Sequence, residues 1–281
     1  MQRKTVFIRG ALCALPDGAS ECTIAVWDGK IASIGRFDPP DGAEIVEANG
    51  LVALPGAVDS HVHFHMPTAD GGYNADDFST GSTCAICGGT TTVVDFASPV
   101  EGKSWTEGVR RRRAEADGKI FCDYGLHMEV TGAFEQDITR LGELADAGVK
   151  VLKIYTTYGS DRYPREKLPA LFREANRLSL RILAHCEDDE IIQETKRRML
   201  AAGRTGAALH AESRPAAAEA AAVRELIGLA EQTGTELIIA HVSTGEAGEL
   251  VAKARKRGVA VYAETCPHYL LLTEELYADK E

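Results

Sequence analysis

One stretch of the chain decides its fold: residues 149–185 read VKVLKIYTTYGSDRYPREKLPALFREANRLSLRILAH. An apolar run at 149–155 is followed by a segment with helical spacing at 164–178 and by a second apolar run at 180–185. Strand, helix and strand in this order are typical of two parallel strands joined by a helical crossover. The stretch therefore predicts a βαβ unit.

The same alternation continues along the chain from residue 51 onward. Strand-like runs lie at about 52–59, 90–96, 120–127, 149–155, 180–185, 236–242 and 259–264. Helical segments include Trp105–Ala116, Pro164–Leu178, Ala216–Thr233 and Glu246–Lys256, and the gap between 185 and 236 leaves room for an insertion. Seven βα units fit a doubly wound α/β sheet or a (β/α)8 barrel. No GxGxxG or Walker-type loop follows the first strand, which favours a TIM-type barrel without its last unit.

The first 51 residues have a different pattern, rich in short strands. Thr23–Trp27 and Lys30–Ile34 flank Asp28-Gly29, a strong signal for a two-residue hairpin, and Glu44–Glu47 predicts another strand. So few strands cannot bury both faces of a sheet, so we expect this part to need strands from elsewhere in the chain. We place the domain boundary between residues 51 and 52.

Composition narrows the class of protein. The 281 residues carry 31 Lys and Arg against 42 Asp and Glu, a formal charge of −11, which disfavours general nucleic-acid binding. No apolar run approaches the ~20 residues of a membrane span. Seven cysteines at irregular spacing suit free thiols in a reducing compartment. We expect a cytoplasmic protein without nucleic-acid or membrane partners.

Two local clusters are interpreted as structural. The basic run Arg110–Arg113 lies in a helical segment and predicts a solvated helix face. Cys84 and Cys87 form a single CxxC in a helical stretch of small residues, which predicts buried side chains rather than zinc ligands.

Histidines follow the ends of three predicted strands. His61 and His63 alternate after the first barrel strand, so their side chains face the same way. His185 ends the fifth strand and His241 the sixth. Reactive groups in a parallel barrel gather at the carboxyl ends of its strands, so these four residues predict a metal site. The remaining histidines are interpreted as structural or peripheral: His65, His127, His210 and His268.

Lys153 lies near the end of the fourth barrel strand. An ion-paired or snorkelling lysine is one interpretation. An ammonium group has three donors and no acceptor, so it cannot bind a metal. Carboxylated by CO2, the same amine becomes a carbamate whose two oxygens can bridge two cations. The residue pattern leaves both interpretations open.

Five separated motifs occur in a characteristic order: His61-Val62-His63, Lys153-Ile154-Tyr155-Thr156-Thr157-Tyr158, Ala184-His185-Cys186-Glu187, Ala240-His241-Val242-Ser243-Thr244 and Glu264-Thr265-Cys266-Pro267. Further stretches accompany them: Phe64-His65-Met66-Pro67, Ala75-Asp76-Asp77-Phe78, Gly88-Gly89-Thr90-Thr91, and Ser213-Arg214-Pro215 with Glu219. Over essentially the whole chain, this set resembles the amidohydrolase superfamily, and within it the dihydropyrimidinases and hydantoinases.

The resemblance implies a metal-dependent enzyme that hydrolyses the ring amide of dihydropyrimidines or hydantoins. It implies a (β/α)8 barrel over residues 52–281, truncated before strand eight, and a small β-sandwich portion over residues 1–51. The aspartate that the family carries at the end of strand eight matches no residue here. We therefore expect the 281 residues to be the N-terminal portion of a longer protein and to be catalytically incomplete by themselves.

The resemblance also implies two divalent metal ions, usually zinc. His61 and His63 would hold one ion, His185 and His241 the other, and a carboxylated Lys153 would bridge them. The full-length protein would be a homo-oligomer, a dimer or a tetramer.

For the substrate, the resemblance assigns Tyr158 as the hydrogen-bond donor to the developing oxyanion. Phe64, Met66 and Tyr155 fall where similar enzymes shape the pocket. The substrate would be a small neutral cyclic amide or ureide.

Three related functions are alternatives. Dihydroorotases usually carry Arg two residues after the second His of the HxH motif, where it binds a substrate carboxylate; His65 occupies that position here, which argues against an anionic ring. Allantoinase remains open because its hydantoin ring is neutral. A non-catalytic scaffold related to dihydropyrimidinases is the alternative from a different class, although all five expected ligands are present.

Overall fold

The computed structural model describes residues 5–68 and 70–278, which form two compact units. The first contains the chain up to Val58 together with Gly89–Thr91, and the second contains Asp59–Gly88 and the chain from Thr92 onward. The domain boundary predicted between residues 51 and 52 stays a prediction.

The first unit is a small sheet of β1 (Thr5–Leu15), β2 (Gly18–Trp27), β3 (Lys30–Gly35), β4 (Glu44–Glu47) and β5 (Val52–Ala53). Its order is β3-β2-β1-β4, and β5 also pairs with β1. The predicted hairpin is confirmed, because Trp27 pairs with Lys30 across the turn. Asp28 and Gly29 have φ angles of 50° and 75°, as a type I′ turn requires.

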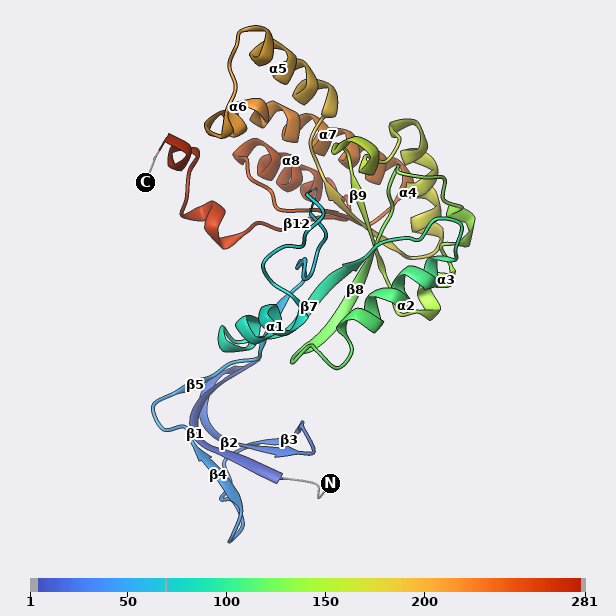
Figure 1. Cartoon of the computed structure of the whole chain (residues 1–281). Coiled ribbons are helices and arrows are strands. Elements are labelled where there is room, and N and C mark those ends of the chain that lie inside the picture. The colour runs from blue at the N-terminus through green and yellow to red at the C-terminus, as the bar shows by residue number, and fades with distance from the viewer. Residues whose placement is uncertain (1–4, 69, 279–281) are drawn as a thin grey trace. The chain divides into compact units, whose positions relative to one another are not determined.

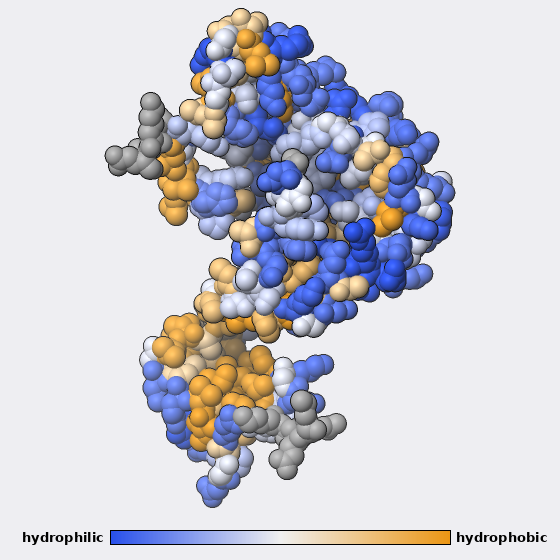
Figure 2. All heavy atoms as spheres, in the orientation of Figure 1, coloured by the Kyte–Doolittle hydropathy of each residue, from blue (hydrophilic) through white to orange (hydrophobic). Residues whose placement is uncertain are grey.

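Large apolar side chains are exposed on this first unit. Trp27, Ile31 and Leu54 are each at least half exposed. Figure 2 shows apolar surface gathered over the N-terminal strands. The buried cluster of the unit is small: Ala11, Cys13, Cys22, Ile24 and Ala48. So few strands leave much apolar surface uncovered.

The second unit is built around a parallel sheet (Figure 1). The strands of this sheet are β6 (Ala57–Asp59), β7 (Thr90–Ala97), β8 (Asp123–Glu129), β9 (Val151–Tyr155), β10 (Arg181–His185), β11 (Leu237–Ile239) and β12 (Val261–Ala263), and the first two residues of β6 and of β7 are grouped with the first unit. In the described part of the chain they follow the order β12-β11-β10-β9-β8-β7-β6, and each register from β7 to β12 is parallel. The sheet is curled with helices along its outer side, which confirms the predicted α/β class of TIM-barrel type.

Helices connect successive strands: α1 (Phe78–Cys87), α2 (Trp105–Ala116), α3 (Glu143–Asp146), α4 (Leu168–Arg177), α7 (Ala216–Thr233) and α8 (Gly245–Lys256). Helix α2 contacts β8, α4 contacts β10, α7 contacts β11 and α8 contacts β12. The predicted helices are confirmed, although α4 begins at Leu168 because Arg165–Lys167 form a 3-10 turn. Among the helices of residues 5–68 and 70–278, none combines the length and apolar character that crossing a membrane requires.

The long gap between residues 185 and 236 holds extra helices, as its length predicted. Helix α5 (Asp189–Ala201) and helix α6 (His210–Ser213) precede α7. Ser213-Arg214-Pro215 forms the connection from α6 to α7.

Alternation along the strands determines which side chains face away from the helices. Leu152 and Ile154 of β9 pack in the core formed with the helices. Val151 packs in a separate cluster with Leu183 and Phe96. Because residues two apart share a face of a strand, Lys153 and His185 follow Val151 and Leu183 on this inner face.

The structure corrects the interpretation of the basic run in α2. Arg110 and Arg111 are exposed, but the side chain of Arg112 is only 11% exposed. Its Nη2 donates to Oδ2 of Asp95 at 2.8 Å and to the carbonyl oxygen of Phe64. The prediction of a solvated face is therefore wrong for Arg112, because the helical period turns this residue toward the sheet.

The prediction of buried cysteines in α1 is also wrong. Cys84 and Cys87 are both exposed. The buried residues of α1 lie nearer its N-terminus, at Phe78, Gly81 and Ser82. In the last turn of this short helix Ala85 packs against the core, whereas both cysteines face outward.

Candidate metal centre

The four predicted histidines and Lys153 gather at the carboxyl ends of the strands. His61 and His63 follow β6, Lys153 lies in β9, His185 ends β10 and His241 follows β11. The ring centroids are 5.3 Å apart for His61 and His63, 5.5 Å for His61 and His241, and 4.7 Å for His185 and His241. The charge of Lys153 acts on His63, His185 and His241. Residues far apart in the sequence thus form one cluster.

Two of these imidazoles face each other through their nitrogens. Nδ1 of His185 lies 3.1 Å from Nε2 of His241. Two nitrogen ligands of one tetrahedral zinc ion lie about 3.4 Å apart, since each Zn–N bond is about 2.0–2.1 Å long. His241 has a φ of 37°, a conformation that non-glycine residues rarely adopt and that is often found at functional sites. The pair therefore fits two ligands of one ion.

The side chain of Lys153 is buried beside two aromatic rings. Its residue is 1% exposed, and its Nζ lies 5.6 Å from the ring centroid of Phe96 and 5.2 Å from that of Tyr155. Among the described residues, no hydrogen bond or ion pair engages this amine, and Glu264 and Glu129 act on it only at a distance. Burial lowers the pKa of Lys153 to about 8. Neither a snorkelling nor an ion-paired lysine matches this environment.

Burial also lowers the pKa of His63 and of His241, which favours their neutral forms. Burial, followed by the charges of His61 and Lys153, lowers the pKa of His63 to about 4. Burial, followed by the charges of His185 and Lys153, lowers the pKa of His241 to about 3. Neutral imidazole is the form that binds metal ions.

The donor set matches a divalent metal in its chemistry, although it is not assembled into a complete site. Within residues 5–68 and 70–278, no three His, Cys, Asp or Glu side chains converge by themselves as a ligand set. Nδ1 of His61 instead pairs with Oε1 of Glu264. The four imidazoles lie together with the buried amine of Lys153, which has no partner in the described part of the chain, and this set of donors suits zinc and similar ions once the rings adjust.

A cavity of about 1180 Å³ opens beside this cluster. His185 and His241 line it together with Tyr158, Glu187, Arg214 and Glu219. The Tyr158 ring lies 4.6 Å from that of His185, and the Tyr158 backbone has a φ of 79°. Burial raises the pKa of Tyr158, so its hydroxyl keeps its proton and can donate a hydrogen bond. The cavity therefore combines candidate metal ligands with a hydrogen-bond donor.

Comparison with known families shows to which family the chain belongs. The amidohydrolase family matches residues 52–276, which contain all the residues of the cluster. The chain belongs to the amidohydrolase family. Enzymes of this family depend on metal ions, in agreement with the donor set described above.

Relatives of the chain include proteins named D-hydantoinase and allantoinase. The chain is 34% identical to a D-hydantoinase of Streptomyces coelicolor over 288 residues, which cover 100% of this chain and 61% of the relative. It is 37% identical to an allantoinase of Desulfitobacterium hafniense over 280 residues, which cover 97% of this chain and 61% of the relative.

Solved structures of hydantoinases share the fold of this chain. A crystal structure of D-hydantoinase matches with a TM-score of 0.92 and 31% identity, over 99% of this chain and 60% of that one. A dihydropyrimidinase from Brevibacillus agri matches with a TM-score of 0.92 and 30% identity, over 99% and 60%. The chain spans about three fifths of the length of the proteins it matches.

The other residues predicted to shape the pocket differ in how close they lie to the histidine cluster. The hydroxyl of Tyr155 donates to Oε1 of Glu129 at 2.7 Å, and the Tyr155 ring lies 6.0 Å from that of Tyr158. Phe64 is buried in the core against Phe78, where Gly81 of α1 makes room for its ring. Met66 is 41% exposed and, like Phe64, does not line the cavity beside His185. Tyr155 and Tyr158 thus lie by the cluster, whereas Phe64 and Met66 do not.

Sequence reasoning missed two charged residues beside His185. Glu187 and Arg214 form an ion pair in which each side chain is 15% exposed. Burial by itself would raise the pKa of Glu187, but hydrogen bonds from His185 and Arg214 outweigh it and hold this pKa at about 2. Both residues stand in motifs that carry the family resemblance, which was the available signal.

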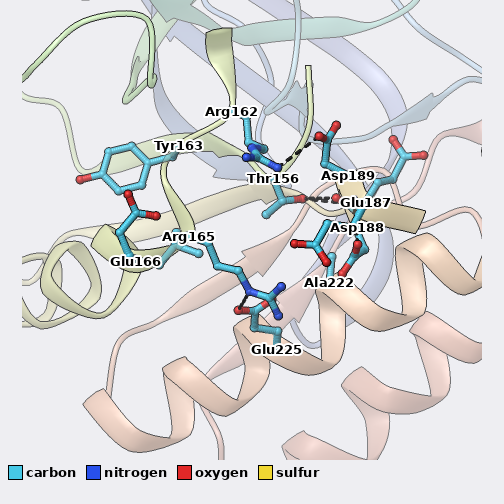
Figure 3. Close-up of a pocket in the computed structure, with 12 residues that line it drawn as sticks. Thr156, Arg162, Tyr163, Arg165, Glu166, Glu187, Asp188, Asp189, Ala222 and Glu225 are labelled. Atoms are coloured by element: carbon cyan, nitrogen blue, oxygen red, sulfur yellow. Dashed lines mark hydrogen bonds and ion pairs between the residues drawn. The ribbon is translucent and has the colours of Figure 1, made fainter. Parts of the chain in front are cut away.

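A second cavity of about 460 Å³ also has Glu187 in its lining (Figure 3). Arg162 pairs with Asp189 at 3.1 Å and Arg165 with Glu225 at 2.6 Å. Each of its two arginines therefore has a carboxylate partner, and the cavity presents no unpartnered basic side chain in the described residues.

Proposed function

We propose that this protein is a metal-dependent cyclic amidohydrolase that opens the ring amide of hydantoins or dihydropyrimidines. The facing nitrogens of His185 and His241, beside the buried Lys153, whose amine has no hydrogen-bond or ion-pair partner in residues 5–68 and 70–278, carry the proposal. Membership of the amidohydrolase family and the similarity to proteins named D-hydantoinase and dihydropyrimidinase support it.

We assign two divalent ions, preferably zinc, to this centre. His61 and His63 would hold one ion, and His185 and His241 the other. Lys153 would bridge them as a carbamate, because a bare ammonium would repel two cations in a buried site. When bound, such ions supply Lewis-acid activation of water and of the ring carbonyl.

The residues of the chain position the substrate in this proposal. The cavity beside the cluster is large enough for a small ring and its substituent. The Tyr158 hydroxyl would donate a hydrogen bond to the carbonyl oxygen as negative charge develops there. Such preorganised donors act most strongly where charge appears in the transition state.

A neutral ring fits the charges of the cavity better than an anionic one. Arg214, which lines the cavity, is already engaged by Glu187. His65 occupies the position where a carboxylate-binding arginine would stand, and its ring stacks on Tyr73 at 3.9 Å. Allantoin is the second candidate, because the chain is 37% identical to an allantoinase.

The test compares four rings on the purified protein with its metal content measured. We expect kcat/KM to be higher for hydantoin or dihydrouracil than for allantoin, and lowest for dihydroorotate. A preference for allantoin would favour the second candidate. Absence of bound metal would favour the non-catalytic scaffold, and a preference for dihydroorotate would refute the neutral-ring assignment.

Tyr158→Phe is expected to lower kcat by roughly a hundredfold, because one donor to the oxyanion is lost. The exposed Tyr262 lies outside the lining of the cavity, so Tyr262→Phe serves as the matched control. Steady-state kinetics with the preferred ring provide the measurement. Equal losses in both variants would contradict the role of Tyr158.

The remaining assignments concern compartment and assembly. We propose a reducing, cytoplasmic compartment because the seven cysteines are all free thiols. A homo-oligomeric state is proposed from the family resemblance. The proposed partner is a small-molecule substrate rather than a nucleic acid, consistent with the net charge of −11.

A further inference from the structure

A charged pair contacts His185 on the side opposite His241. Nε2 of His185 donates to Oε2 of Glu187 at 2.6 Å. Nε of Arg214 donates to Oε1 of the same carboxylate at 2.9 Å, and its Nη2 donates to Oε2. The carboxylate therefore accepts bidentate hydrogen bonds from the guanidinium on one side and a hydrogen bond from the imidazole on the other.

The backbone beneath this pair is also held in place. The hydroxyl of Thr156 donates to the carbonyl oxygens of His185 at 2.9 Å and Glu187 at 2.8 Å, and it accepts from the N–H of Glu187 at 2.8 Å. Figure 3 shows Thr156 and Glu187 joined in this way. The ring of His185 and the carboxylate of Glu187 thus start from a fixed backbone.

Arg214 connects this pair to the candidate catalytic tyrosine. Its guanidinium carbon lies 5.0 Å from the centroid of the Tyr158 ring. The ring of Tyr158 in turn lies 4.6 Å from that of His185. One arginine, from the connection between α6 and α7, therefore contacts both the partner of His185 and Tyr158.

The chemistry of the contact selects one form of the His185 ring. An ionised carboxylate only accepts hydrogen bonds, so the nitrogen that faces Glu187 must carry the proton. In a neutral imidazole the other nitrogen, Nδ1, then has a free lone pair, and Nδ1 is the atom that faces His241. Partners of this kind commonly fix the tautomer and orientation of metal-binding histidines.

We propose that Glu187 and Arg214 are positioning residues: they fix His185 with its Nδ1 lone pair toward the metal centre, and Arg214 also holds the ring of Tyr158. The Ser213-Arg214-Pro215 motif thereby gains a role at the centre, although it lies between two helices outside the strands. This inference rests on the proposed metal site.

The test uses Glu187→Gln and Arg214→Lys, with Glu187→Ala and Arg214→Ala as stronger changes. Arg204→Ala is the matched control. Arg204 also makes a bidentate ion pair, with Glu212, but this pair lies at an exposed site in the same segment. Zinc affinity is measured by competition with a chromophoric chelator. The tautomer of His185 is read from the 15N shifts of its ring in the metal-free protein, assigned with a His185→Gln variant.

We expect the Glu187 variants to weaken zinc binding by roughly 10- to 100-fold, with Arg214→Lys intermediate and Arg204→Ala unchanged. The 15N shifts should report a single Nε2-protonated form in the parent protein and a mixture of tautomers in Glu187→Gln. Because Glu187→Gln nearly keeps the shape of the side chain, it remains informative if Glu187→Ala fails to fold.

Two failures are distinguishable. If the parent protein binds no zinc, the proposed function fails. If the parent binds zinc and folded Glu187→Gln and Arg214→Ala bind it equally well with unchanged 15N shifts, the positioning role is refuted while the metal site stands.

Discussion

Lys153→Ala is expected to abolish tight binding of two metal ions and to lower kcat for ring opening by roughly a thousandfold or more. The magnitude follows because Lewis-acid activation by paired ions is worth several kcal/mol, and about 4 kcal/mol corresponds to a factor of a thousand. The variant leaves the four histidines in place but removes the only group we assign to both ions.

Metal content by elemental analysis and steady-state kinetics check this expectation. Lys150→Ala is the matched control, since Lys150 is exposed and lies just before the same strand. A short carboxylic acid in the medium should partly restore both metal binding and activity in Lys153→Ala, by supplying the missing oxygens. Full occupancy by two ions in Lys153→Ala without any additive would show that Lys153 does not bridge them.

Arg112→Ala is expected to lower the free energy of unfolding by about 3–5 kcal/mol, the cost of breaking a buried ion pair. Asp95 is 1% exposed and would lose its cationic partner. The carbonyl of Phe64, next to His63, would lose a donor as well. Arg112→Ala should therefore also weaken metal binding at His61 and His63.

The effect of Arg112→Ala on stability should depend on pH through the ionisation of Asp95. Burial raises the pKa of Asp95 to about 6, although Arg112 opposes the rise. A carboxyl group whose pKa is higher in the folded state binds more protons when folded, so stability falls as pH rises through that value. Without Arg112 the pKa of Asp95 should rise further. The loss of unfolding free energy caused by Arg112→Ala should therefore be larger at pH 8 than at pH 5.

Urea unfolding at both pH values measures the effect. Arg110→Ala is the control on the same helix: Arg110 is exposed and pairs only with Glu107, so the expected change is about 0.5 kcal/mol or less. The loss of unfolding free energy in Arg112→Lys should lie between the losses in Arg112→Ala and Arg110→Ala, because lysine keeps the charge but lacks the planar guanidinium group. A loss below about 1 kcal/mol in Arg112→Ala would show that this ion pair contributes little.

The sequence by itself determined the order of the elements and the set of strand-end residues. Asp28-Gly29 specifies a turn because few residues tolerate its positive φ angles, so the hairpin was predictable from two residues. The strand that carries Lys153 and the one that ends at His185 are recognisable from local apolar runs. Parallel strands bring their carboxyl ends to one edge, so the clustering of the histidines followed from a local pattern and the fold class.

Only the tertiary structure decided which charged side chains are buried and which partners they pair with. Arg112 of helix α2 stands among three other arginines in the sequence, and its burial depends on Asp95 of strand β7. Glu187 and Arg214 meet because the segment after α5 returns to β10, and Phe64 enters the core because Gly81 of α1 leaves space for its ring. The difference has one physical cause: strand and turn signals act between neighbours in the chain, whereas burial and ion pairing depend on groups that only the folded chain brings together.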